Sequence, residues 1–486
     1  MNLLPVNNSD LNSDRPLLDA TRRYFFSQCG IGLGAMALSA LSLRESAGTS
    51  PATVNPLAAK PGHYPGRAKS VIFLFMAGGP SQLEMFSHKP KLAELDGESP
   101  PPHILEGKRF AFLKGEEKML GPQRKFSRHG ESDTWLSDLL PHHRQIVDDI
   151  CILQGVQTDV FNHGPAKIFL NTGSPQMGRP SMGSWLTYGI GSTANNLPGF
   201  VVLQSGPRGP RNGTQLWSSG FLPTTYQGVA FRKGKTPILN LEPPVGIGRD
   251  AQGQFISALH DMNAMHFDRV GDAEILTRIA AYEMAYRMQT SAPELMNIEN
   301  ETQATLDAYT VEKAKPSFGA NCLLARRLVE RGVRFVQLYH TNWDHHGGDE
   351  GINTELPIRC QQIDQPIAAL IKDLKQRGLL DQTLVVWGGE FGRTPMGEVR
   401  GTIGRDHHIE AYTMWMAGAG IRPGMTYGRT DELGMGVEEG AIHVHDLQAT
   451  ILHCLGLDHT KLTYRFQGRE FRLTDVHGRV VEEILA

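Results

Sequence analysis

The sequence predicts an α/β fold with a doubly wound, mostly parallel central sheet and helices on both faces. Three observations predict it. The short run KSVIFLFMAGG (69–79) is apolar on both faces, which is typical of a buried strand in a parallel sheet. Amphipathic helices then alternate with short apolar strands in the second half of the chain. Glycine follows several of these helices, at positions where a helix commonly ends.

The helix and strand units of the second half can be followed along the chain. Each helix is recognised by its cap and by apolar residues at helical spacing, and each strand by a short apolar run. A helix in 271–290 is expected to cover one face, and the C-terminal stretch after 463 is expected to form short strands and turns. The expected units are a helix from the N-cap Ser317 to Arg331, a strand over 333–339, a helix over 360–377 closed by Gly378, a strand over 382–390, a strand over 410–420 and a helix over 445–457, which His443, His445 and Asp446 are expected to cap.

The N-terminal segment indicates export. Arg22 and Arg23 precede an uncharged run rich in Gly, Ala and Leu that extends to Leu43, which resembles a signal of the twin-arginine (Tat) pathway. The alternatives are an ordinary helix with a basic start or an uncleaved anchor. We therefore expect a Tat-type signal over 1–47, a flexible linker over 48–67 and a single α/β domain over 68–486. The protein would be periplasmic or extracellular and would contact a membrane only through the signal.

The composition narrows the class of partner. The net charge of −3 over 486 residues gives no basic surface for nucleic acid. The five cysteines include no C-x-x-C pair, so a cysteine zinc site is not indicated, and we expect isolated, mostly buried thiols. Long loops or insertions are expected near 100–130 and 204–250, where substrate specificity would be decided.

Polar motifs follow three of the predicted strands. Because ligands collect at the carboxyl ends of parallel strands, these loops are expected to meet at one edge of the sheet. TNWDHHGG (341–348) follows one strand, Glu390 follows another and Glu84 lies in the loop after the first. The stretch GRDHH (404–408) is expected to be a loop that folds over the same edge.

Carboxylates and imidazoles in one place suit a divalent ion such as Zn, Mn, Mg or Ca. In the Asp-x-His spacing, Asp344 and His346 turn the same way and would share an ion. The plainer interpretation is a polar loop, and Glu390 would then pair with Arg393. His163 is either a ligand or a loop hydrogen-bonding residue, whereas His88, His142 and His143 are expected at the surface. Anionic oxygens of a substrate would be bound by Arg179, Arg393 and Arg405.

Taken together, the motifs resemble one family. The twin arginine, LFMAGGPSQLEMF, NHGPAKIFLNTGSPQMGRPSMGSWLTYGIG, WDHHGG, WGGEFGRTP, GRDHH and the segment from HVHDLQ to TDVHG occur in this order. Their combination is similar to the domain-of-unknown-function 1501 family of exported, sulfatase-like bacterial proteins. That family in turn resembles, distantly, the alkaline phosphatase and sulfatase superfamily, which implies an alkaline-phosphatase-like core with metal ligands on the strand-end loops.

The superfamily resemblance implies roles for particular residues. Asp344 and His346 would hold one metal, and Glu390 would stand where the superfamily has an Asp-His pair. Ser181, close to the start of the helix in GRPSMGSWLTYG, would be the nucleophile, with Thr172 and Ser174 as competitors, or it would simply be an N-cap. Further ligands would come from the late histidine position and its neighbours, and from the first loop: Asp406, His407 or His408, and Glu84.

The sequence also departs from the superfamily pattern. Gly78 and Gly79 stand where the superfamily has an Asp after the first strand, and Phe391 replaces the histidine after Glu390. The formylglycine signature C-x-P-x-R is absent, which argues against a formylglycine sulfatase. Two hypotheses follow. The protein is a metal-dependent hydrolase of sulfate or phosphate esters, acting on a small anionic ester or on a sulfated or phosphorylated glycan, or it is a non-catalytic descendant that binds a glycan, an anion or a protein.

Overall fold

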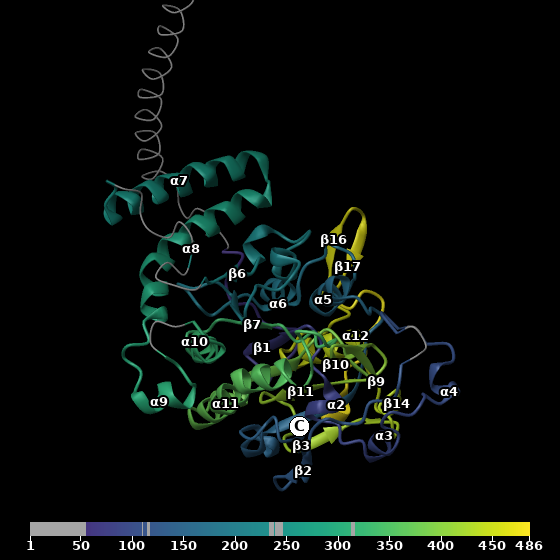
Figure 1. Cartoon of the computed structure of the whole chain (residues 1–486). Helices are drawn as coiled ribbons and strands as arrows, with labels where there is room; N and C mark the ends of the chain where they lie inside the picture. Colours follow the sequence, from purple (N-terminus) through teal and green to yellow (C-terminus); the bar gives the residue numbers. More distant parts are fainter. Residues whose placement is uncertain (1–54, 109, 114–116, 233–237, 239–245, 313–315) are drawn as a thin grey trace, which may run out of the picture. The chain divides into compact units, whose positions relative to one another are not determined.

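A mixed, mostly parallel sheet runs through the centre of the part of the chain that the structure describes (Figure 1). The computed structural model describes residues 55–486 apart from 109, 114–116, 233–237, 239–245 and 313–315. In spatial order the strands of this sheet are β12 (Met425–Tyr427), β4 (Ile150–Gln157), β11 (Tyr412–Ala417), β8 (Thr383–Gly388), β1 (Ser70–Ala77), β7 (Phe335–Thr341), β5 (Phe200–Ser205) and β6 (Val229–Ala230), with β15 (Ile442–His443) also paired to β4.

The strand directions confirm the predicted fold class. β6, β5, β7, β1 and β8 are parallel neighbours, whereas β11 is antiparallel to both β8 and β4. The chain between β8 and β11 contains a β-hairpin and no crossover helix. It therefore returns from the edge at which β8 ends, and a strand that starts at that edge must run the opposite way.

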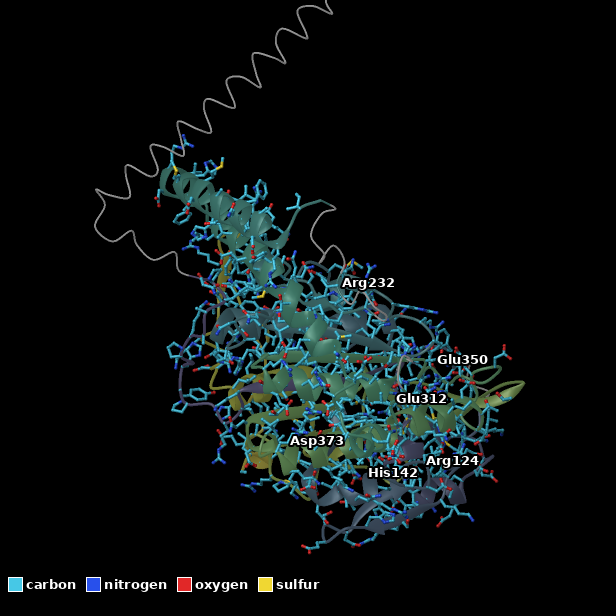
Figure 2. All side chains as sticks on the ribbon, turned by 90° about the vertical axis from the view of Figure 1, so that its left-hand side faces the viewer. Arg124, His142, Arg232, Glu312, Glu350 and Asp373 are labelled. Atoms are coloured by element: carbon cyan, nitrogen blue, oxygen red, sulfur yellow. The ribbon has the colours of Figure 1, made fainter. Side chains whose placement is uncertain are left out.

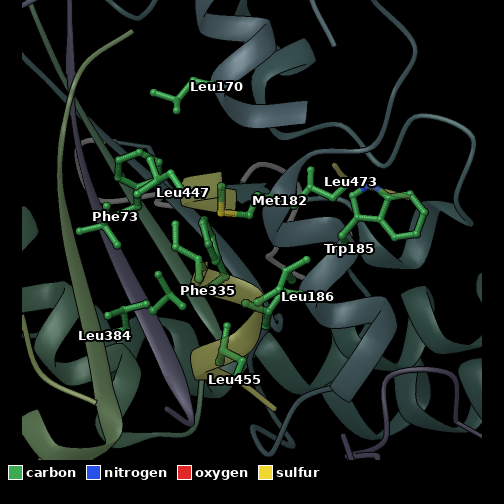
Figure 3. Packing of buried hydrophobic residues seen from close by; sticks show 14 of the residues in the cluster. Phe73, Leu170, Met182, Trp185, Leu186, Phe335, Leu384, Leu447, Leu455 and Leu473 are labelled. Carbon is green, nitrogen blue, oxygen red and sulfur yellow. The ribbon is translucent and has the colours of Figure 1, made fainter. Parts of the chain in front are cut away.

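Helices cover both faces of the sheet, as predicted. Alternate residues of β1 point to opposite faces and all are buried. Phe73 belongs to a core layer with residues of α5 (His163–Thr172), α6 (Met182–Ile190) and α12 (Val444–Cys454), among them Leu170, Met182 and Leu447 (Figure 3). Leu74 faces the other layer, formed by α10 (Phe318–Glu330) and α11 (Glu355–Gln376).

The predicted helix caps are present. The Ser317 hydroxyl accepts a hydrogen bond from the amide of Ala320 at the start of α10. His443 and Asp446 form a reciprocal capping box at the start of α12. Side chains therefore fix where these two helices begin, and both begin within one residue of the expected start, whereas α12 ends at Cys454 and not at 457.

The remaining elements surround the sheet. The helix expected in 271–290 is part of α8 (Ala273–Met296), which pairs with α7 (Arg249–Val270). The expected C-terminal strands are the hairpin β16–β17. The shorter elements are α2 (Gln82–Met85), α3 (Pro90–Glu94), α4 (Pro102–Leu105), α9 (Gln303–Ala308), β2 (Phe126–His129), β3 (Thr134–Ser137), β9 (Gly392–Arg400), β10 (Thr402–His408), β13 (Arg429–Thr430), β14 (Val437–Glu439), β16 (Tyr464–Phe466) and β17 (Arg469–Phe471).

The segment expected to be a flexible linker packs against the α/β unit over its described part. The amide of Lys60 donates to the carbonyl of Ile190 (2.9 Å), and that of His63 donates to Gly456 (2.8 Å). The residues from Asn55 onward thus belong to the same compact unit as the α/β core. The expected signal over 1–47 and Cys29 lie outside the described residues. No described helix is long and apolar enough to cross a membrane.

Two further expectations concern buried side chains. The four described cysteines, Cys151, Cys322, Cys360 and Cys454, are buried and free, as expected. His143, expected at the surface, is buried instead. Its ring Nδ1 lies 2.6 Å from Asp364 Oδ1, and the amides of His142 and His143 donate to the same carboxylate (2.7 and 2.9 Å). The chain before β4, which carries His142 (Figure 2), is thus tied to α11.

Replacing Asp364 by Asn should destabilise the fold. Burial raises the pKa of this carboxyl, but the hydrogen bonds from His143 and His142 outweigh burial and lower it. We expect the free energy of unfolding to fall by about 2–3 kcal/mol near pH 7, measured by urea denaturation. Because a lowered pKa stabilises only the ionised form, the difference from the parent should shrink as the pH falls below about 4. Asp381→Asn, at an exposed aspartate, is the control, and equal losses in both variants would contradict the assignment.

Candidate metal centre

The ends of three neighbouring parallel strands bring the predicted motifs to one edge of the sheet. In the pairing of β1 with β7, Ala77 lies opposite Thr341, and in the pairing of β1 with β8, Phe75 lies opposite Gly388. The three strands therefore end at nearly the same level. After β7 the backbone turns at Asn342, which has a positive φ of 78°. The expected meeting of the strand-end loops is confirmed.

Gly78 allows these loops to approach closely. Its φ is +128°, and a Cβ at this position would lie 2.7 Å from the amide nitrogen of Trp343 and 2.8 Å from that of Asp344. No side chain fits there without moving the backbone that carries Asp344. The glycine at the end of β1 therefore sets how closely the loop after β7 can pack against β1.

The stretch GRDHH is a strand and not the expected loop. It forms β10, which pairs antiparallel with β9, with an irregularity between Arg405 and His407. A Cβ on Gly404 would lie 2.0 Å from the carbonyl carbon of His346, so β10 lies directly against the DHH loop. The amide of Arg405 also donates to the carbonyl of His345 (3.0 Å). The stretch lies over the same edge of the sheet, as expected, but as part of a β-hairpin.

Four side chains from three segments converge at this edge. The ligand atoms of His163, Asp344, His346 and His407 all lie within 4.8 Å of one another. Asp344 Oδ1 is 2.8 Å from His346 Nε2 and 3.4 Å from His407 Nε2, and its Oδ2 is 3.0 Å from His163 Nε2. His163 is the first residue of α5, so this helix delivers it to the strand-end loops. We refer to these four residues as the His₃Asp cluster.

Each histidine of the His₃Asp cluster has an acceptor on its other ring nitrogen. His163 Nδ1 lies 2.7 Å from Glu390 Oε1, and His346 Nδ1 lies 2.6 Å from Glu398 Oε1. His407 Nδ1 lies 2.6 Å from the carbonyl oxygen of Phe161. Because a carbonyl or an ionised carboxylate only accepts, each Nδ1 carries the hydrogen. Each Nε2 is then left to face the Asp344 carboxylate, the arrangement that is usual for metal-binding histidines.

The facing Nε2 atoms fit a cation between them. His346 Nε2 and His407 Nε2 are 2.9 Å apart, and in neutral rings both would present lone pairs to each other. Burial lowers the pKa of His407 to about 4, and Arg393 adds to this effect. His163 Nε2 is buried and, although close to Asp344, makes no hydrogen bond of good geometry. Ring nitrogens whose lone pairs converge on one carboxylate are what a metal ion would satisfy.

Arg393 compensates part of the charge of the cluster. Its side chain is fully buried, and its guanidinium donates to Asp344 Oδ1 (2.7 Å) and to the carbonyls of Gly79 (2.8 Å) and Arg405 (2.9 Å). Burial raises the pKa of Asp344, but the Arg393 guanidinium and the three neighbouring histidine side chains lower it far below its usual range. Asp344 is therefore ionised, as a ligand must be.

Two of the acidic residues predicted as ligands have other partners. Glu390 accepts hydrogen bonds from the Gly78 amide (3.0 and 3.2 Å) and orients His163, so it stands behind the cluster. Glu84 is not in the cluster, because it forms a fully buried ion pair with Arg405 (2.8 Å). Arg405, predicted to bind substrate oxygens, is thereby occupied.

Asp406 and His408 also lie outside the His₃Asp cluster. Asp406 accepts hydrogen bonds from the amides of Phe112 (2.8 Å) and His407 (2.7 Å). Burial raises the pKa of Asp406, and the nearby Glu398 carboxylate raises it further. With His346 and Glu398 it forms a second group of close ligand atoms. His408 Nε2 lies 2.9 Å from the carbonyl of Met435. Because side chains alternate along a strand, neighbouring residues of β10 face different surroundings.

The other predicted site residues lie elsewhere. Arg179 is 3.7 Å from Asp475 and lies over the ring of Phe471. Ser181 occupies the N-cap position of α6, and its hydroxyl is 2.9 Å from that of Ser184. Among the described residues, no hydrogen bond or ion pair joins Ser181 to the cluster. The Thr172 hydroxyl, a competitor of Ser181 as nucleophile, donates to the carbonyl of Ile168 (2.8 Å) within α5.

Sequence reasoning missed three side chains beside the cluster. Glu398 and Phe112 belong to no recognisable sequence motif. In the structure, the ring of Phe112 packs edge-on against His346 (5.1 Å between ring centroids). Lys167 follows His163 by four residues in the helix α5, so helical spacing places both on one face and could have indicated it. His345, between the two ligand positions 344 and 346, is buried, and burial lowers its pKa to about 3.

The cluster opens into a cleft on one side. The cleft is small, with a volume of about 30 Å³, and is lined by Ala77, Gly78, His163, Lys167, Arg208, Gly209, Pro210, Arg211, Thr341, Asn342 and Asp344. Within the cluster, the Asp344 side chain is 24% exposed, compared with 3% for His407. A ligand in the cleft would therefore reach the cluster from the side of Asp344 and His163.

Comparison with known proteins places the chain in a family. Residues 68–485 match the family model described as "Protein of unknown function (DUF1501)". The chain belongs to this family. No curated protein matches it significantly. The match covers both strand-end motifs and the hairpin that carries His407.

Solved structures of low identity show a distant likeness. They include a phosphonate monoester hydrolase from Silicibacter pomeroyi, with 13% identity over 86% of this chain and 76% of that one and a TM-score of 0.35. An alkaline phosphatase superfamily protein from Vibrio parahaemolyticus has 11% identity over 84% and 72%, with a TM-score of 0.31. A sulfatase from Pseudoalteromonas sp. has 11% identity over 88% and 72%, with a TM-score of 0.33. The function is therefore inferred from the geometry of the site.

Replacing Glu390 by Gln should weaken metal binding although Glu390 is not in the cluster. The amide cannot reproduce the charge-assisted hydrogen bond that fixes the His163 tautomer, and loss of such a partner usually lowers metal affinity about 10–100-fold. Affinity is measured by competition with a chromogenic chelator. Glu84→Gln is the matched control, because it changes a buried carboxylate that pairs with Arg405. It should lower the melting temperature and leave metal affinity unchanged, and the reverse pattern would contradict the assignment.

Proposed function

We propose that the protein is a metal-dependent hydrolase of phosphate or sulfate esters, with one divalent ion bound by the His₃Asp cluster. The observation that carries the proposal is the convergence of three histidine Nε2 atoms on Asp344 while every Nδ1 is held by an acceptor. The cluster also opens into a cleft, whereas structural metal sites are closed by their protein ligands.

The donor set narrows the proposed ion. Three imidazole nitrogens with one carboxylate suit borderline ions such as Zn²⁺ or Mn²⁺, whereas Ca²⁺ and Mg²⁺ prefer oxygen ligands throughout. We therefore favour Zn²⁺ or Mn²⁺ among the four ions expected from the sequence. When bound, the ion would supply Lewis-acid polarisation of the ester.

The protein residues around the cleft indicate how an ester would be handled. His163 and Asp344 line the cleft, so the reacting group would be placed on their side. Thr341 is the hydroxyl residue among the described cleft-lining residues, and its Oγ1 donates to the carbonyl of Arg208 (2.6 Å). Among the described residues, no basic side chain contacts this hydroxyl. We therefore propose water as the nucleophile, in place of Ser181. Arg393 would keep Asp344 ionised and in position throughout.

A second candidate function has one observation in its favour. The guanidinium of Arg393 donates to Asp344 Oδ1 and lies 3.3 Å from His346 Nε2, so cations of the protein already satisfy part of the cluster. A non-catalytic protein that binds a glycan, an anion or a protein partner would use the same arrangement as a rigid polar core. Export by the Tat pathway is proposed for either function, from the sequence of residues 21–43.

The decisive prediction is the metal content. Chain 55–486, purified without chelator and reloaded with Zn²⁺ or Mn²⁺, should carry one ion per chain, measured by inorganic mass spectrometry. Asp344→Ala and His407→Ala should each lose the ion, because removing one of four ligands leaves an incomplete site. The loaded protein should also hydrolyse a phosphate or sulfate monoester.

His408→Ala is the matched control for the metal measurement. It removes the histidine next to His407, but its ring is bonded to the carbonyl of Met435, so the ion should be retained. An ion that is absent from the parent chain after reloading would exclude the metalloenzyme and favour the binding protein. An ion that is present without ester hydrolysis would leave a metal-binding protein and remove the proposed activity.

A further inference from the structure

Lys167 places a buried positive charge beside the cluster without a partner. The side chain is only 4% exposed, yet it lines the cleft one helical turn after His163. Its Nζ makes no hydrogen bond or ion pair with the described residues. Burial lowers the pKa of Lys167, with Glu390 opposing this shift and Arg211 adding to it. A buried ammonium group that makes no direct ion pair is costly, and an anion in the cleft would reduce that cost.

The loop after β5 brings two arginines to the rim of the same cleft. Arg208 and Arg211 both line it, together with Gly209 and Pro210. The Thr341 hydroxyl binds the Arg208 carbonyl (2.6 Å), which fixes this loop to the end of β7. A Cβ on Gly206 would lie 2.5 Å from Thr341 Oγ1, so the loop and the strand are in close contact. The arginines are therefore carried by a fixed part of the backbone.

The positive charge of the cleft is poorly balanced by the protein. Arg208 lies 3.4 Å from Asn342 Oδ1 and 3.8 Å from Glu350, an acidic residue at the surface (Figure 2). Arg211 makes no recorded hydrogen bond or ion pair with the described residues. Asp344 is the acidic residue that lines the cleft, and it is already bonded to Arg393. Three cations thus face one cleft at two depths: Lys167 inside and the two arginines at the rim.

We infer that the cleft binds a substrate with two anionic groups. The inner group would lie against Lys167 and the His₃Asp cluster, and the outer group would bind Arg208 and Arg211. The inner part of this inference rests on the proposed function, because it places the reacting ester at the metal. The preferred substrate is then an ester with a second anionic group nearby, as in a multiply sulfated or phosphorylated molecule, over an isolated monoester. Arginine suits the outer group because its fork of donors matches planar or tetrahedral oxyanions.

The test compares two small alkyl sulfonates that carry different numbers of anionic groups. Methanesulfonate carries one and 1,2-ethanedisulfonate carries two, and both bind metals weakly. We expect the disulfonate to bind the metal-loaded chain at least about tenfold more tightly, measured by calorimetry. Arg211→Gln should remove this preference and leave the methanesulfonate affinity within twofold. Arg465→Gln, which neutralises an exposed arginine of β16, should retain the preference. Equal affinities in the parent, or an unchanged preference in Arg211→Gln, would overturn the inference.

Lys167→Met tests the inner position separately. It should lower the affinity for both probes about tenfold and raise the melting temperature by about 1–3 °C, because it removes an unpaired buried charge. Its metal content should equal that of the parent. A lower melting temperature with unchanged probe affinity would overturn the inner position.

The metal-free chain separates this inference from the proposed function. If the chain binds no metal but still prefers the disulfonate, the anion sites stand and the hydrolase proposal fails. If it binds one ion and hydrolyses a monoester without any preference for the disulfonate, the hydrolase stands and the second anion site fails.

Discussion

The buried carboxylate of Asp344 is the group on which the arrangement of the site depends. An ionised carboxylate in the interior is costly unless it is paired and hydrogen-bonded. Asp344 meets this requirement with His163 from α5, His346 from its own loop and Arg393 from β9. Because these partners come from separate elements, the carboxylate is satisfied only when α5, the loop after β7 and the β9–β10 hairpin have all assembled at the sheet edge.

The sheet and its functional edge could be predicted from the sequence because they depend on local patterns. β1 and β8 are short runs that are buried on both faces, and such runs are recognisable without knowledge of their neighbours. Parallel strands that end at the same level then bring their loops together, which is why the loop with Asp344 and His346 was expected at the same edge as Glu390. The caps at Ser317 and at His443 with Asp446 also depend on residues close in sequence.

The rest of the site depends on contacts that no local pattern encodes. β9 and β10 are strands rich in charged residues, and these are buried by pairing, as Arg405 is with Glu84. A pattern of apolar residues therefore misses them, and GRDHH was expected to be a loop. Likewise, nothing near Glu390 in sequence shows that its carboxylate holds His163, 227 positions away, and does not itself face the centre of the cluster.

The end of β1 shows why this site differs from the pattern of ligands that the superfamily resemblance implied, in which an Asp follows the first strand. A carboxylate would be needed there, but Gly78 is in contact with the backbone of Trp343 and Asp344, and a Cβ would overlap it. The amide of Gly78 instead donates to Glu390, whose other contact orients His163. Thus the position that would supply an acidic ligand supports a histidine indirectly. The close packing that excludes the ligand also holds in place the loop that carries Asp344, and the His₃Asp cluster formed by this loop could hold a metal ion.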